Sequence, residues 1–217
     1  MELIVPFLGA VSKDSPIEHL SLLLNSYKKH LVGMVPWPQY GYKPDVHFAM
    51  AYGKDCVFIK YYVNEKSVKA IYKQPNEPVH KDSCVEFFVS FGNEQGYYNF
   101  EFNCAGTCML GFGTSKTDRK LLPEAVVRMI RHQANLKPAD TPGHGNISWE
   151  LTLMIPFEVF SHHSFTSLNG EECRGNFYKC GDDLPEPHFL AWNDIKSTDP
   201  DFHLPEFFGK MKFEDLT

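Results

Sequence analysis

KDSCVEFFVSFGNEQGYYNFEFN, residues 81–103, predicts the β-hairpin around which the rest of the chain is organised. Two segments rich in aromatic and β-branched residues flank a short polar turn that contains glycine, which is typical of two paired antiparallel strands. Successive side chains of a strand point to opposite faces. One face of the hairpin is therefore apolar and belongs to the core, with Val85, Phe87, Val89 and Phe91 from the first strand and Tyr98, Phe100 and Phe102 from the second.

The opposite face of the same hairpin is polar. It carries Glu86 on the first strand and Asn99 and Glu101 on the second. Once the two apolar faces share a core, the pairing register brings Glu86 opposite Glu101 or Asn99. Two facing carboxylates cost stability unless a cation, a proton or a hydrogen-bonding ligand relieves their repulsion. We therefore expect a ligand-binding site on this face.

Strand patterns continue through most of the chain. Residues 147–156 show the cleanest alternation of apolar and polar residues, which places Trp149 in the core. Residues 46–52 and 56–63 predict a second hairpin. About a dozen short strands predict an all-β fold, a β-sandwich. The further strands are expected at residues 2–11, 68–73, 107–112, 125–133, 174–182 and 207–213.

One α-helix is expected near the N-terminus. Ser15-Pro16-Ile17-Glu18 places proline at the first helical position and resembles a capping box. Apolar residues then recur at helical spacing as far as Leu31, which predicts about three or four turns that end at Gly33.

A loop rich in proline and aromatic residues follows the helix at residues 35–44. Prolines remove backbone donors, so this stretch is not expected to form regular structure. Its aromatic residues include Trp37 and Tyr40. Such side chains more often plug the open end of a sandwich, and the alternative is that they form the aromatic rim of a binding site.

Length, composition and charge narrow the class of protein. The chain has 217 residues, of which 43% are hydrophobic, and lacks a long linker, so residues 1–217 are expected to form a single domain. The formal net charge is −6 and the 21 Lys and Arg form no basic stripe, which argues against a nucleic-acid partner. The opening MELIVPFLGAV has neither a basic leader nor the length of a membrane span. We expect a cytoplasmic protein without a membrane partner, or a secreted or periplasmic one if the true start differs.

The six cysteines show no CxxC pair and no histidine at zinc-finger spacing. Several fall inside expected strands. This pattern favours small buried thiols in a reducing compartment over a disulfide framework or a metal site. No set of metal ligands is predicted from the spacing.

Four segments, in this order, resemble carbohydrate-binding modules of family 9. They are Asp-Ser-Cys-Val-Glu-Phe-Phe from residue 82, Asn-Phe-Glu-Phe-Asn from residue 99, Trp-Glu-Leu…Ile-Pro-Phe-Glu from residue 149, and Ala-Trp-Asn-Asp…Phe-Phe-Gly-Lys-Met-Lys-Phe from residue 191. The resemblance covers residues 44–214 and leaves residues 1–40 outside. It implies a jelly-roll-like or immunoglobulin-like sandwich of the DOMON-like superfamily. Family members usually serve as non-catalytic modules of xylan- and cellulose-degrading enzymes, so a carbohydrate ligand and a glycoside hydrolase partner are implied for this free-standing chain.

The resemblance also implies site residues. Family members grip a sugar end between two aromatic side chains, and Trp192 falls on one of them. Glu86 falls on the family's sugar-binding glutamate. Asn99 and Glu101 fall on a polar pair that is Arg and Asn in the better-known members. The second aromatic would lie near His80, where this sequence has no tryptophan, so His80 is the candidate for that wall.

Three further expectations concern ions and chemistry. Lys179 is a candidate counter-charge for the two carboxylates if its strand neighbours the hairpin. The family also binds structural calcium, for which the candidate ligands are Asp182, Asp183, Asp194, Asp199 and Asp201. The main function expected is non-catalytic sugar binding. The alternatives are a glycoside hydrolase that uses Glu86 and Glu101 as its carboxylate pair, and a DOMON-like haem-binding protein with His or Met ligands.

Overall fold

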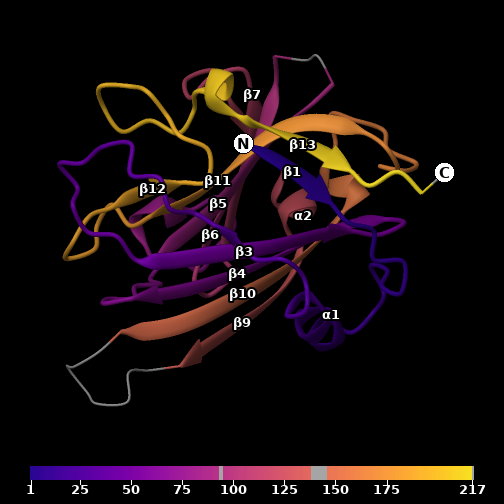
Figure 1. The fold of residues 1–217 in the computed structure, drawn as a ribbon, viewed down its shortest axis with the longest axis horizontal. Coiled ribbons are helices and arrows are strands. Elements are labelled where there is room, and N and C mark those ends of the chain that lie inside the picture. The colour runs from indigo at the N-terminus through magenta and orange to yellow at the C-terminus, as the bar shows by residue number, and fades with distance from the viewer. Residues whose placement is uncertain (93–94, 138–145, 217) are drawn as a thin grey trace.

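The computed structural model describes residues 1–92, 95–137 and 146–216 as two β-sheets packed face to face (Figure 1). The larger sheet has the strand order β1 (Glu2–Val5), β13 (Gly209–Phe213), β11 (Glu172–Cys180), β5 (Cys84–Phe91), β6 (Tyr97–Asn103), β7 (Cys108–Gly113) and β8 (Lys120–Leu121), and β12 (Phe189–Ala191) also pairs with β11. The smaller sheet has the order β2 (His30–Leu31), β3 (Asp45–Tyr52), β4 (Cys56–Glu65), β10 (Ile147–Pro156) and β9 (Arg131–Lys137). The predicted all-β sandwich is confirmed.

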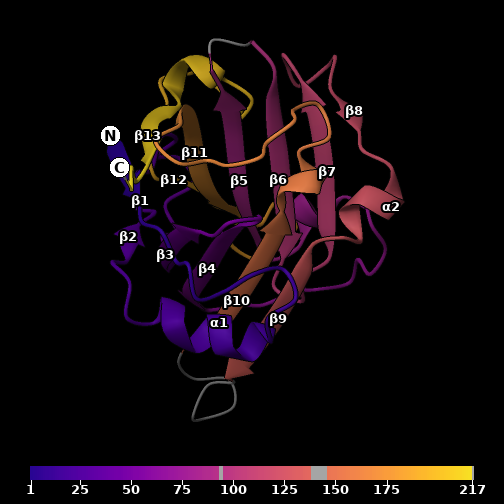
Figure 2. The ribbon, with the colours of Figure 1, turned by 90° about the vertical axis from the view of Figure 1, so that its right-hand side faces the viewer.

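Helical segments are short and lie outside the two sheets. They are α1 (Ile17–Leu24), α2 (Glu124–Val127), and the 3-10 turns η1 (Val79–Lys81), η2 (Phe157–Val159) and η3 (Pro205–Phe207). Figure 2 shows β11, β5, β6 and β7 side by side in the larger sheet, with α1 lying across the smaller one. None of the helices in the described ranges has the length and apolar character needed to cross a bilayer.

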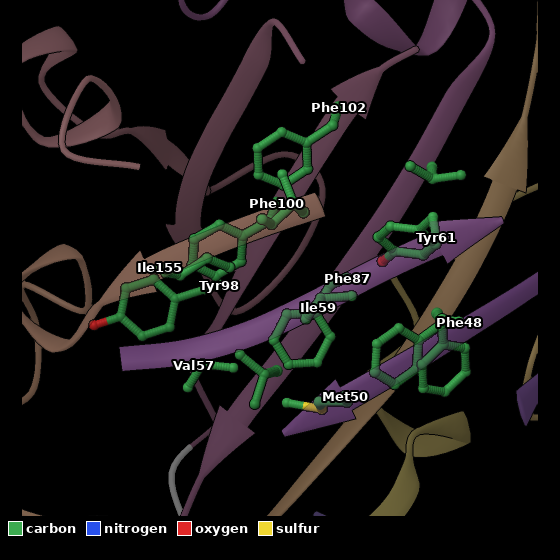
Figure 3. Packing of buried hydrophobic residues seen from close by; sticks show 14 of the residues in the cluster. Phe48, Met50, Val57, Ile59, Tyr61, Phe87, Tyr98, Phe100, Phe102 and Ile155 are labelled. Atoms are coloured by element: carbon green, nitrogen blue, oxygen red, sulfur yellow. The ribbon is translucent and has the colours of Figure 1, made fainter. Parts of the chain in front are cut away.

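The core fills the space between the sheets, as the alternation of side chains predicts. Phe87 and Phe100 from the opening hairpin meet Phe48, Ile59 and other residues of the smaller sheet (Figure 3). Trp149 is 1% exposed, which confirms its predicted place in this core. Because the buried set takes members from both sheets, burial of apolar surface is what holds the two layers together.

Helix α1 exists but is shorter than its apolar spacing predicts. It ends at Leu24, and His30–Leu31 instead pair with β3 as strand β2. Its buried face covers the outer side of the smaller sheet, where Leu20 and Leu24 join a cluster that includes Phe58. Beneath it, Lys60 is 1% exposed and lies 2.8 Å from the Glu150 carboxylate. Pairing with the edge of β3 therefore places His30 and Leu31 in a strand, where the apolar spacing had predicted the end of the helix.

Three expected strands are corrected. Residues 68–73 form no strand, because the backbone N–H groups of Ile71 and Tyr72 donate to the Asp82 carboxylate instead of to a neighbouring strand. The expected strand 125–133 begins only at Arg131, because Pro123 precedes the short helix α2. The expected strand 2–11 ends at Val5.

Candidate functional site

The hairpin β5–β6 has the register that brings its two carboxylates together. Glu86 lies directly opposite Glu101 on the face turned away from the core, which is one of the two pairings predicted from the sequence. Strand β11 runs on the other side of β5 and places Tyr178 opposite Glu86 and Cys180 opposite Cys84. All five side chains are buried, because loops cover this outer face of the larger sheet.

A cavity of about 130 Å³ remains between this face and the loops that cover it. Glu86, Glu101 and Cys180 line it from the sheet. His80, which is half-buried on η1, and Asp182, which follows β11, line it from the sides. The cavity therefore opens on the carboxylate pair that the strand parity predicted.

The two carboxyl groups differ in their surroundings. Burial, and then the charge of Glu101, raise the pKa of Glu86 well above its usual value. Burial would also raise the pKa of Glu101, but His80 and the positive charge of Arg119 outweigh it and hold the pKa below its usual value. Glu86 is thus favoured as a neutral hydrogen-bond donor, and Glu101 as a charged acceptor.

Arg119 is the cation that pairs with Glu101, and Lys116 is a further cation on the lining of the cavity. Its Nη1 donates to Glu101 Oε1 at 2.9 Å and to His203 Nε2 at 3.1 Å. Because a guanidinium can only donate, His203 Nε2 accepts, so Nδ1 carries the proton and donates to the Tyr97 hydroxyl at 2.9 Å. This neutral imidazole agrees with the pKa of His203, which burial and Arg119 lower to about 4. The chain from Tyr97 to Glu101 fixes the orientation of the guanidinium.

Aromatic side chains form one wall of the cavity. Phe202 stacks on Tyr178 with ring centroids 4.2 Å apart, and Phe189 lies 6.1 Å from Phe202. Tyr40 contacts Phe189 edge-on at 4.8 Å, and Trp37 is 1% exposed behind both phenylalanines. Trp37 and Tyr40 therefore support this wall from behind, which agrees with the plug that the sequence favoured over a ligand rim.

The structure places Trp192 in the core and not in the cavity. It is 3% exposed, packs edge-on against Phe48 and Phe177 between the two sheets, and leaves no room for a side chain at Gly209. The expectation that Trp192 forms an aromatic platform for a sugar is therefore wrong. The reason is its position just after β12, where its ring turns inward between the sheets.

Lys179 is also on the wrong face to act as a counter-charge for Glu86. Its strand does neighbour the hairpin, but Lys179 pairs with Val85 and points into the sandwich. There its Nζ lies 2.9 Å from the Glu65 carboxylate and donates to His188 Nε2 at 2.8 Å. Residues two apart on a strand point to the same face, so the apolar Phe177 in the sequence could have indicated that Lys179 points inward.

The remaining predicted residues divide between the cavity and its support. His80 lies in the cavity, with Nδ1 3.6 Å from Glu101 Oε2, and this carboxylate raises its pKa. Asn99 is fully buried and donates to Glu101 Oε1 at 2.9 Å, so it orients Glu101 without lining the cavity. Of the five aspartates expected to hold calcium, Asp182 and Asp201 line the cavity. Structural calcium stays a prediction.

Sequence reasoning missed Arg119, His203 and the two phenylalanines of the wall. Arg119, Phe202 and His203 lie in loops, which no strand parity constrains, and Phe189 begins the short strand β12. The repulsion expected between the two carboxylates was the one signal in the sequence for a nearby cation. That signal indicates a residue type, Lys or Arg, and gives no position in the chain.

Comparisons with known proteins agree with this fold. Residues 18–213 match carbohydrate-binding family 9. A structure from Bacteroides uniformis, provisionally described as a carbohydrate-binding protein, is 38% identical over 98% of this chain and 99% of that chain, with a TM-score of 0.89. No curated protein matches the chain.

Two structures of a family 9 carbohydrate-binding module from Caldicellulosiruptor kristjanssonii share the fold at low identity. The complex with glucose is 11% identical with a TM-score of 0.64, over 100% of this chain and 97% of that chain. The complex with cellotriose is 12% identical with a TM-score of 0.62, over 100% of this chain and 95% of that chain.

The family match begins inside α1 and runs to the last strand, so it takes in nearly the whole sandwich and the hairpin that carries the cavity. On this match and the 38% identity with the Bacteroides protein, the chain belongs to carbohydrate-binding family 9.

Proposed function

We propose that this chain binds the end of a mono- or oligosaccharide in the cavity over Glu86 and Glu101, without cleaving it. The observation that carries the proposal is a partly open cavity in which a neutral carboxyl, a charged carboxylate and a fixed guanidinium lie beside an aromatic wall. Family membership and the glucose and cellotriose complexes of the Caldicellulosiruptor module support the ligand class.

The chemistry of a sugar suits these groups. A sugar ring presents flat C–H patches and a rim of hydroxyls, which an aromatic plate and fixed donors and acceptors recognise. Phe189 and Phe202 supply the apolar surface. Glu101 accepts a hydrogen bond from a sugar hydroxyl, and Arg119 donates to one. Glu86 can donate to a hydroxyl when it is protonated and can accept from one in either protonation state. A ligand hydroxyl that donates to Glu101 would also relieve the repulsion between the two facing carboxyl groups.

Titration calorimetry with glucose, cellotriose and xylose tests the proposal. Removing a hydrogen bond to a charged group costs about 1.5–3 kcal/mol, so Glu101→Gln and Arg119→Met should each weaken binding by about tenfold or more. Glu186→Gln is the matched control, because this exposed carboxylate pairs with Lys66 away from the cavity. The site assignment fails if no sugar binds at millimolar concentration, or if Glu101→Gln binds as tightly as the unchanged protein.

A glycoside hydrolase is the second candidate, and the unequal pKa values of Glu86 and Glu101 favour it. A carboxyl group with a raised pKa, Glu86, facing one with a lowered pKa, Glu101, corresponds to a general acid and its charged partner. Against it, Arg119 and Asn99 both hold Glu101, which suits a fixed acceptor better than a nucleophile. Hydrolysis of aryl glycosides that disappears in Glu86→Gln would establish the enzyme. A role beside a partner hydrolase that acts on xylan or cellulose stays a prediction.

A further inference from the structure

Two cysteines and a glutamate that are distant in the sequence meet at the floor of the cavity. Cys84 and Cys180 lie directly opposite each other on β5 and β11, and Glu86 is two residues along β5 on the same face. Their donor atoms all lie within 4.8 Å of one another, and the three side chains are buried. Within the described part of the chain, this is the one group of three or more His, Cys, Asp or Glu donors so close together.

The distances suit tetrahedral coordination. With metal–sulfur bonds of about 2.3 Å and metal–oxygen bonds of about 2.1 Å, a tetrahedral ion holds a sulfur and an oxygen about 3.6 Å apart. Glu86 Oε1 lies 3.1 Å from Cys180 Sγ and 3.9 Å from Cys84 Sγ. Each separation is within about 0.5 Å of the value that coordination requires. Because paired strands hold all three residues, no backbone rearrangement is needed.

The group is accessible, and among the residues that the structure describes no Lys or Arg forms an ion pair with Glu86, although Lys116 also lines the cavity. Glu86 and Cys180 line the cavity, so an ion can reach them from solvent. Arg119 donates to Glu101 and His203, and Lys179 points into the other side of the sheet. At present the Cys180 thiol donates to Glu86 Oε1, so a proton occupies the position between sulfur and oxygen that an ion would take.

We propose that Cys84, Cys180 and Glu86 bind a thiophilic divalent cation of the Zn²⁺ class, with the fourth coordination position facing the cavity. Two thiolates and one carboxylate are ligands that select such an ion over calcium or magnesium. Binding exchanges the two thiol protons, and the Glu86 proton where it is present, for the ion, and no electrons are transferred. The fourth position remains for water or for a hydroxyl of a ligand in the cavity.

The site uses the same Glu86 that the sugar is proposed to contact, but it does not depend on sugar binding. Its test therefore contains no sugar. If metal binding fails while calorimetry detects a sugar, only this proposal is overturned, and the reverse result overturns only the proposed function.

The experiment loads the reduced, chelator-treated full chain with Co²⁺ and then displaces it with Zn²⁺. We expect one equivalent of Co²⁺ to give a sulfur-to-cobalt charge-transfer band in the near ultraviolet and the intense visible bands of tetrahedral cobalt. One equivalent of Zn²⁺ should abolish both. In the unchanged protein, bound Zn²⁺ should also slow the alkylation of Cys180, the thiol that lines the cavity, as mapped by mass spectrometry.

Variants separate this site from adventitious binding. Losing a ligand should weaken Zn²⁺ binding by more than about 100-fold in Cys84→Ser and Cys180→Ser, since even the loss of a supporting contact costs 10–100-fold. Cys173→Ser is the matched control, because Cys173 lies on the same strand as Cys180 but faces the core. A cobalt spectrum without the sulfur band, or equal weakening in Cys173→Ser, overturns the proposal. The alkylation result on the unchanged protein decides the matter if the serine variants do not fold.

Discussion

Replacing Arg119 by methionine tests whether a single cation makes the carboxylate pair tolerable. The substitution keeps much of the length of the side chain and removes the guanidinium that donates to Glu101 and to His203. Glu101 would then face Glu86 across the hairpin, with His80 as its nearest cationic neighbour. We expect Arg119→Met to fold with clearly reduced stability at neutral pH.

The magnitude follows from the burial of the pair. The Glu101 side chain is 4% exposed and that of Arg119 is 17% exposed. Removing one partner of a buried pair costs about 3–5 kcal/mol because the other charge stays buried. The partial exposure of Arg119 to the cavity reduces this to about 2–3 kcal/mol. For a chain of this size, the midpoint of thermal unfolding should fall by about 4–12 °C.

The loss of stability in Arg119→Met should also depend on pH, and the direction of that dependence shows whether the charge of Glu101 causes it. In the unchanged protein the pKa of Glu101 is lowered, so its contribution to stability is present above the unfolded pKa and is lost as pH falls through the folded pKa. Without Arg119, burial is opposed mainly by His80, so the folded pKa of Glu101 rises and its contribution to stability is lost at a higher pH than in the unchanged protein. The stability deficit of Arg119→Met should therefore shrink between pH 7 and pH 5.

Urea unfolding followed by circular dichroism at both pH values measures this deficit. Glu101→Gln in the Arg119→Met background should recover most of it, because the uncompensated charge is then gone. The control is Arg128→Met, whose exposed pair with Glu124 is worth about 0.5 kcal/mol or less. A loss no larger than that of Arg128→Met, or a deficit that does not change with pH, would refute the assignment of Arg119 as the compensating cation.

Three further predictions concern residues outside the cavity. Trp192→Phe should lower the free energy of unfolding by about 1–3 kcal/mol and leave sugar affinity unchanged in calorimetry, because Trp192 fills the core; a tenfold loss of affinity at unchanged fold would contradict this. Lys179→Met should cost about 3–5 kcal/mol in urea unfolding, and adding Glu65→Gln should restore much of it, since the two form a buried pair; an unrestored double variant would point to packing instead. Burial, and then Lys179, lower the pKa of His188 to about 3, so below its usual pKa of 6.5 the unfolded chain binds the extra proton and stability falls by up to about 1.4 kcal/mol per pH unit. His188→Asn should flatten that slope in urea unfolding between pH 6.5 and 4.5, and an unchanged slope would be the contrary result.

Much of the fold could be predicted because burial acts on a local pattern. The hairpin, the strand at 147–156 and the facing of Glu86 and Glu101 all follow from alternation along a strand, and the structure confirms each of them. Two of the predictions that failed are ones in which another segment competes for the backbone. Asp82 takes the donors of the expected strand at 68–73, and the edge of β3 takes the end of the expected helix.

The sequence by itself determined that two carboxylates share one face of a hairpin, where a cation, a proton or a ligand must relieve their repulsion, because alternation in a strand has a period of two. The tertiary structure decided which groups surround the two carboxylates. It brought Arg119 from a loop, turned Trp192 and Lys179 into the sandwich, and set Cys84 beside Cys180. The physical reason is that pairing between distant strands and the path of loops depend on packing of the whole chain, which local spacing does not encode.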